Sequence, residues 1–133
     1  PLPEGWTVEK PIIPPTLEEA RTAKLAEINA GYCTVMDYVQ AGYPLDEVLS
    51  WERQAIQARE LAQNPDAEAL FVRTLAATKK ITVEELCRRI LANAVSWEPV
   101  AAMLTGCRQV MEEGAFSAET VEEIQAIKVS YPA

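Results

Sequence analysis

The feature that most constrains the fold is a long apolar stripe with helical spacing in the second half of the chain. Side chains that recur every three or four positions share one face of an α-helix, and an apolar face must be buried against other elements. The stripe therefore predicts a helix at the centre of the core, beginning near Ile81 and closed by Gly114. Its members are Val83, Leu86, Cys87, Ile90, Ala94, Trp97, Ala101 and Leu104.

Pro99 lies within this stripe. A proline ring inside a helix collides with the carbonyl four residues earlier and lacks an N–H donor. We therefore expect either a kink or a break from which the helix restarts at Ser96.

A second apolar seam predicts a helix that starts at Leu17 and is ended by Gly42 and Pro44. The seam covers two heptads, fewer than a coiled coil requires, so packing inside the same chain is favoured. Its residues, spaced three and four apart, are Leu25, Ile28, Tyr32, Val35 and Val39.

Three further helices complete the predicted fold. One spans residues 45–63, a short one is capped by Asn64 with Pro65 at its first position, and the last spans residues 116–127. The inward residues expected on the helix at 45–63 are Leu45, Val48, Leu49, Ala55 and Ile56. With no strand pattern, residues 17–133 are predicted to form an all-α domain of about five helices in a bundle-like or orthogonal array.

Residues 1–16 contain five of the nine prolines and predict an extended segment, a linker or tether from an upstream part. Whether Pro1 is the natural start or a fragment boundary is left open. Trp6 is expected either to fold back on the domain or to contact a partner.

Adjacent acidic residues follow a threonine three times, as TLEE at residue 16 and TVEE at residues 82 and 120. A threonine followed by glutamate three positions later is the capping box that begins a helix, contributing about 1 kcal/mol. Catalytic carboxylates would instead need a cleft and a second group across it. We interpret all three pairs as helix caps.

The residues needed for most catalysis are missing. The chain has no histidine, and Cys33, Cys87 and Cys107 are widely spaced among apolar neighbours, as expected of buried thiols in a reducing compartment. No glycine-rich phosphate loop is present. We therefore expect no catalytic, cofactor-binding or metal site, no cofactor and no enzymatic activity.

The net charge is −8 and the pI is near 4.6, which disfavours binding to nucleic acid or anionic lipid. No apolar run is long enough to span a bilayer, and no signal peptide opens the chain. We expect a protein that acts in, or is assembled from, the cytosol.

One alternative is a helix-turn-helix DNA-binding domain, suggested by LAATKKITVEELCRRI at residues 75–90 with its four basic residues. That fold needs a turn after Ile90, whereas LANAVSW continues the helical pattern.

Several segments in order resemble the C-terminal helical modules of phage and prophage tail fibre assembly proteins. The segments are LPEGW, ARTAKLAEINA at 20–30, residues 64–94, CRQVMEE at 107–113 and TVEEIQAI at 120–127. The resemblance implies a non-enzymatic role in helping tail fibres fold, trimerise or attach, in the bacterial host cytoplasm during assembly. Presence in the finished virion tail, or a role as a structural tail subunit, stays open. The N-terminal part of such proteins is absent here, so the alternative expectation is a support or oligomerisation module.

The implied partner is a tail fibre or another tail protein, with a homo-oligomer as a further option. The predicted contacts are Trp6, Leu25, Ile28, Tyr32, Val35 and Val39, because apolar and aromatic groups at an exposed edge mark contacts. The competing interpretation, that this seam is simply core, is favoured.

The charge predicts that the purified protein does not bind duplex DNA at moderate salt, since a chain of net charge −8 gains nothing from neutralising phosphates. Fluorescence anisotropy of a labelled duplex measures this. Saturable binding would support the helix-turn-helix alternative.

Overall fold

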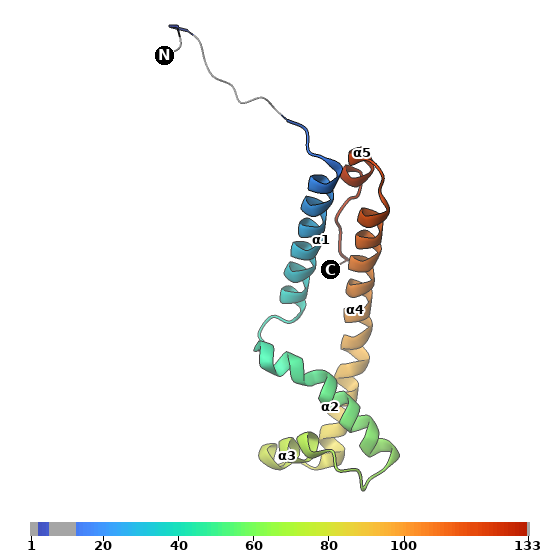
Figure 1. The fold of residues 1–133 in the computed structure, drawn as a ribbon. Helices are drawn as coiled ribbons and strands as arrows, with labels where there is room; N and C mark the ends of the chain where they lie inside the picture. Colours follow the sequence, from blue (N-terminus) through green and yellow to red (C-terminus); the bar gives the residue numbers. More distant parts are fainter. Residues whose placement is uncertain (1–2, 6–12, 133) are drawn as a thin grey trace.

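A computed structural model describes residues 3–5 and 13–132 and shows an all-α fold (Figure 1). Within these residues there are five helices, as the sequence predicts. They are α1 (Leu17–Val39), α2 (Leu45–Gln63), α3 (Leu70–Lys79), α4 (Val83–Ser117) and α5 (Val121–Gln125). None of these helices has both the length and the apolar character needed to cross a membrane. Trp6 lies outside the described residues.

Helix α4 is the central element, and the other helices are arranged along its length (Figure 1). Its 35 residues make a rod roughly 52 Å long. Helices α2 and α3 pack against its N-terminal half, while α1 and α5 lie along its C-terminal half. The predicted core position of this helix is confirmed.

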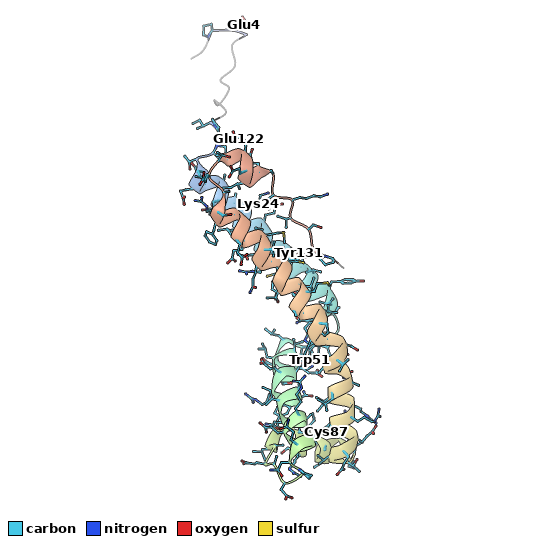
Figure 2. All side chains as sticks on the ribbon, turned by 90° about the vertical axis from the view of Figure 1, so that its right-hand side faces the viewer. Glu4, Lys24, Trp51, Cys87, Glu122 and Tyr131 are labelled. Carbon is cyan, nitrogen blue, oxygen red and sulfur yellow. The ribbon has the colours of Figure 1, made fainter. Side chains whose placement is uncertain are left out.

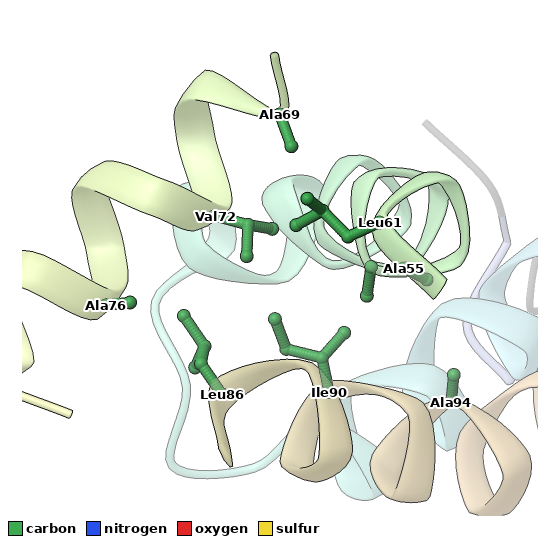
Figure 3. Packing of buried hydrophobic residues seen from close by; sticks show 9 residues of the cluster. Ala55, Leu61, Ala69, Val72, Ala76, Leu86, Ile90 and Ala94 are labelled. Atoms are coloured by element: carbon green, nitrogen blue, oxygen red, sulfur yellow. The ribbon is translucent and has the colours of Figure 1, made fainter. Parts of the chain in front are cut away.

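The core is divided into two parts along α4. The larger part, between α2, α3 and α4, consists of Ala55, Ala58, Leu61, Ala69, Val72, Ala76, Leu86, Ile90 and Ala94. Leu61, Val72 and Ile90 point toward one another at its centre (Figure 3). A smaller cluster of Ala20, Ala118 and Ile124 joins α1 to α5. Five of the nine residues in the larger part are alanines, so the helices there approach closely.

Helix α4 passes through Pro99 without a break, so the alternative of a restart at Ser96 is wrong. Figure 2 shows the helix changing direction near the level of Trp51, as the kink prediction requires. The Trp51 ring meets Trp97 edge-on at 5.4 Å and Tyr43 at 5.1 Å. These contacts brace the helix where proline removes a hydrogen bond.

Three predicted helix ends are wrong. Helix α3 begins at Leu70, because the Asn64 side chain accepts from the Asp66 N–H at 3.0 Å and holds a turn instead of a cap. Gly114 lies inside α4, which continues to Ser117. Helix α5 is therefore shorter than residues 116–127, and Thr120 caps its start.

Two predictions of burial are also wrong. On α2 the buried residues are Ala55, Ala58 and Leu61, whereas Leu45, Leu49 and Ile56 face solvent. The small inner residues let α2 lie close to α4, and the larger apolar residues are left outside. Cys33 is exposed rather than buried, because it lies on the outer side of α1, and Cys87 and Cys107 are half-buried.

The chain after α5 returns along α1 toward α4 (Figure 1). The Tyr131 hydroxyl donates to the Ile28 carbonyl at 2.7 Å, and Lys24 Nζ donates to the Ile127 carbonyl at 2.9 Å. Gly31 makes room for this segment, since a Cβ there would lie 3.0 Å from Tyr131 Cε2. The tail thus closes one side of the α1–α4 contact.

Arg21 joins the N-terminal end of α1 to the C-terminal end of α4. Its side chain is 16 % exposed, and it donates to the carbonyls of Ala115 and Ala118, each at 3.0 Å. These carbonyls lie at the C-terminal end of α4, where no helical N–H is available to them.

Replacing Arg21 with methionine should destabilise the fold by about 1–3 kcal/mol, because two half-buried carbonyls lose a charged donor. Chemical denaturation measures the free energy of unfolding. The matched control is Arg88→Met, whose side chain is 68 % exposed and makes only intrahelical ion pairs, so it should change little. Equal losses in both variants would contradict the role given to Arg21.

Candidate interaction surface on helices α2 and α3

Helix α2 is apolar on two opposite sides. Its inner side is buried against α3 and α4, and its outer side exposes Leu45, Leu49 and Ile56 to solvent. A helix that contacts the rest of its domain on one side usually has a polar opposite side. The outer side is therefore a candidate contact surface.

Two adjoining hollows extend this surface. The larger, about 580 Å³, lies between α2 and α3 and is lined by Arg53, Gln57, Leu70, Phe71, Thr74, Leu75 and Thr78. The smaller, about 330 Å³, is lined by Leu49, Glu52, Arg53, Ile56, Gln57 and Glu60. Arg53 and Gln57 line both hollows, so we call these residues together with Leu45 the α2–α3 surface.

Arg53 and Gln57 supply hydrogen-bond donors at the larger hollow. The Gln57 Oε1 atom accepts from the Val72 N–H at 3.0 Å. The NH₂ group of the same side chain therefore remains able to donate hydrogen bonds to a partner. The Arg53 guanidinium lies 6.0 Å from the Phe71 ring centroid and makes no ion pair within residues 13–132. The hollow is thus apolar, with one cation at its edge.

This combination suits a particular kind of group. An apolar side chain can fill the space beside Leu70 and Phe71, while a neighbouring carboxylate accepts hydrogen bonds from Arg53.

The seam predicted to contact a partner lies elsewhere and faces α4. Ile28 is fully buried, so it cannot contact a partner in this conformation, and Leu25, Tyr32, Val35 and Val39 are half-buried. Tyr32 shares a hydrogen bond with Thr105 at 3.0 Å, and its ring centroid is 6.2 Å from that of Tyr131. The seam therefore packs inside the chain, as the favoured interpretation holds.

Sequence reasoning missed the α2–α3 surface because it allowed α2 a single apolar face. The spacing of Leu45, Leu49 and Ile56 is helical, and we assigned these residues to the core with Ala55. Ala55 points about a quarter-turn away from Ile56 on a helix, so the two cannot share one narrow face. This angle between Ala55 and Ile56 was the feature of the sequence that could have indicated two apolar sides on α2.

The three threonines cap helices as predicted, but only one capping box is complete. The Thr16 and Glu19 side chains each accept from the other's backbone N–H. Thr82 accepts from the Glu85 N–H at 3.1 Å, yet the Glu85 carboxylate binds arginines instead of reaching back. Glu123 accepts from the Glu119 N–H.

The acidic pairs begin three different helices and do not gather around one site. In the part of the chain that the structure describes, no cluster of three or more Asp, Glu, Cys or His residues could hold a metal ion. The same part lacks the turn after Ile90 that a helix-turn-helix needs, since α4 continues to Ser117.

Comparisons of this chain with protein family models, with curated proteins and with solved structures found no match.

Among the described residues, Glu85 is the carboxylate whose pKa is clearly shifted from its ordinary value. Hydrogen bonds from Arg88 at 2.6 and 2.9 Å, and then from Arg89 at 3.0 Å, lower its pKa from 4.5 to about 2. All three side chains lie on the first turns of α4, so the shift reflects an intrahelical ion pair.

Carbon-detected NMR titration should find the Glu85 pKa near 2, and Arg88→Met should raise it toward 4.5. Since the pKa is lower in the folded state, this exposed pair adds a small stabilisation above about pH 4.5, and that effect is lost as the pH falls toward 2. A Glu85 pKa above 4.5 would contradict the ion pair and indicate a different environment.

Proposed function

We propose that this protein is a non-enzymatic interaction module that acts in phage or prophage tail assembly, helping a tail fibre to fold or attach. The exposed α2–α3 surface carries the proposal, because it is an apolar surface with a shaped hollow in a fold that needs no further burial there. The biological setting rests on the resemblance to tail fibre assembly proteins.

The surface can supply binding energy through its largest exposed side chains. Leu70 is 66 % exposed and lies at the larger hollow. Covering such a side chain with a partner contributes about 1.5–3 kcal/mol. Arg53 beside it would favour a partner segment in which an acidic residue accompanies an apolar one.

The surface is also held in place by the core beneath it. Val72 and Ala76 on α3 pack against Leu86 on α4, and the bond from the Val72 N–H to Gln57 ties α3 to α2. A preformed surface loses little conformational entropy on binding. The partner is a tail fibre or another tail protein, bound in the host cytoplasm during assembly.

Co-expression with a phage tail fibre protein tests the proposal. The protein should raise the yield of soluble, assembled fibre, and Leu70→Asp should weaken capture of the fibre about tenfold or more, because a carboxylate would have to be buried there. The matched control is Val110→Asp, at a position on α4 with 68 % exposure.

Far-UV circular dichroism and thermal unfolding check that both variants fold. If the wild-type protein leaves fibre yield unchanged, the tail-assembly role is wrong. If Leu70→Asp and Val110→Asp behave alike while the wild type assists assembly, the α2–α3 hollow is not the docking site.

A further inference from the structure

We propose that the outer side of α2 binds a second copy of this chain, forming an antiparallel, two-fold symmetric pair of α2 helices. This goes beyond the proposed function, because it uses the outer stripe of α2, whereas the proposed fibre contact centres on Leu70 and Phe71 of α3. Arg53 borders both regions. The stripe consists of Leu45, Leu49, Glu52, Arg53, Ile56 and Glu60.

The spacing of the residues in the stripe suits contact with a second helix. Leu45, Leu49, Glu52 and Ile56 follow one another at intervals of four, three and four residues. This is the interval at which a helix presents side chains to a second helix lying nearly parallel or antiparallel to it. The stripe runs almost opposite the buried side of α2, so nothing in the described fold covers it.

The charges of the stripe are of both signs and have no ion-pair partner among the described residues. Glu52, Arg53 and Glu60 take part in none of the ion pairs of this region, whereas Arg59 on another side of α2 donates to Glu98 on α4 at 2.8 Å. Charges left unpaired on an apolar stripe are available to an external partner.

The middle of the stripe, from Leu49 to Ile56, is complementary to itself. In an antiparallel pair centred between Glu52 and Arg53, Leu49 lies opposite Ile56 of the second copy, and Glu52 lies opposite Arg53 of the second copy. The two-fold axis repeats both contacts, which is the pattern of an isologous interface. A parallel pair would instead set Glu52 against Glu52, which repels.

The length of α2 limits the area of the dimer interface and therefore the affinity of the dimer. Helix α2 is roughly 28 Å long, so a pair of such helices forms an interface at the small end of the specific range. The net charge of −8 on each copy also opposes association. The result is a reversible dimer with a dissociation constant on the order of 10–100 µM.

Sedimentation velocity of the whole protein from about 5 to 500 µM tests this, because that range brackets the expected dissociation constant. The wild type should shift from monomer to dimer, and Leu49→Asp should remain monomeric. The matched control is Val110→Asp, since Leu49 and Val110 are each 68 % exposed, and it should dimerise as the wild type does.

Charge exchange tests whether residues 52 and 53 of the two copies face each other across the interface. E52R gives the stripe two adjacent positive charges and R53E gives it two adjacent negative charges, so each variant alone should stay monomeric at about 500 µM. Mixed together they should form a heterodimer, because each opposed pair then joins opposite charges. Circular dichroism confirms that the variants fold.

Two results would overturn the proposal: a wild type that stays monomeric throughout the range, or mixed variants that fail to associate. Leu70→Asp lies outside the stripe and should dimerise normally. If the protein assists fibre assembly but never dimerises, only this inference is wrong. If the protein dimerises but does not assist fibre assembly, only the proposed function is wrong.

Discussion

The fold depends on one continuous helix, α4, which must pass through Pro99 without ending. An internal proline removes a backbone hydrogen bond and costs about 3 kcal/mol in an isolated helix. Here the helix is held on both sides of that point, by Leu86 and Ile90 in the larger part of the core and by the buried Leu104 beyond the proline. The edge-on contact of Trp51 with Trp97 lies two residues before the proline. Tertiary packing thus offsets a local defect.

This division of the core along α4 explains the open shape of the molecule. Helices α2 and α3 pack on one half of α4 and α1 packs on the other half, while α5 packs against α1 (Figure 1). Each helix is covered mainly on the side that faces α4. Outer sides are consequently exposed, and on α2 the outer side is apolar. The candidate interaction surface is a direct consequence of building a domain around a rod.

The two proposed contacts divide that surface by chemistry. The hollow beside Phe71 is apolar with a single cation at its edge, which favours an acidic and apolar partner segment. The stripe through Leu49 and Ile56 carries charges of both signs, and in an antiparallel pair Glu52 of one copy lies opposite Arg53 of the other. Arg53 borders both regions, so occupation of one contact will affect the other through this side chain.

The sequence by itself determined the helices and most of their starts. Helical spacing located α1, α2 and α4, and Thr16, Thr82 and Thr120 cap helices where the sequence placed them, because capping is a contact among residues a few positions apart. The ends were less predictable. Gly114 proved compatible with a helix interior, and Asn64 caps the end of α2 and forms a turn rather than capping the start of α3.

Only the tertiary structure decided which apolar residues are buried. Leu45 and Leu49 have the same hydrophobicity as the leucines of the core, yet they face solvent because the alanines of α2 allow the closest approach to α4. For the same reason the candidate contact surface lies on α2 and not on the α1 seam that the sequence suggested, where Ile28 is buried. Spacing along one helix shows which side chains share a face, but which face is covered depends on helices distant in sequence.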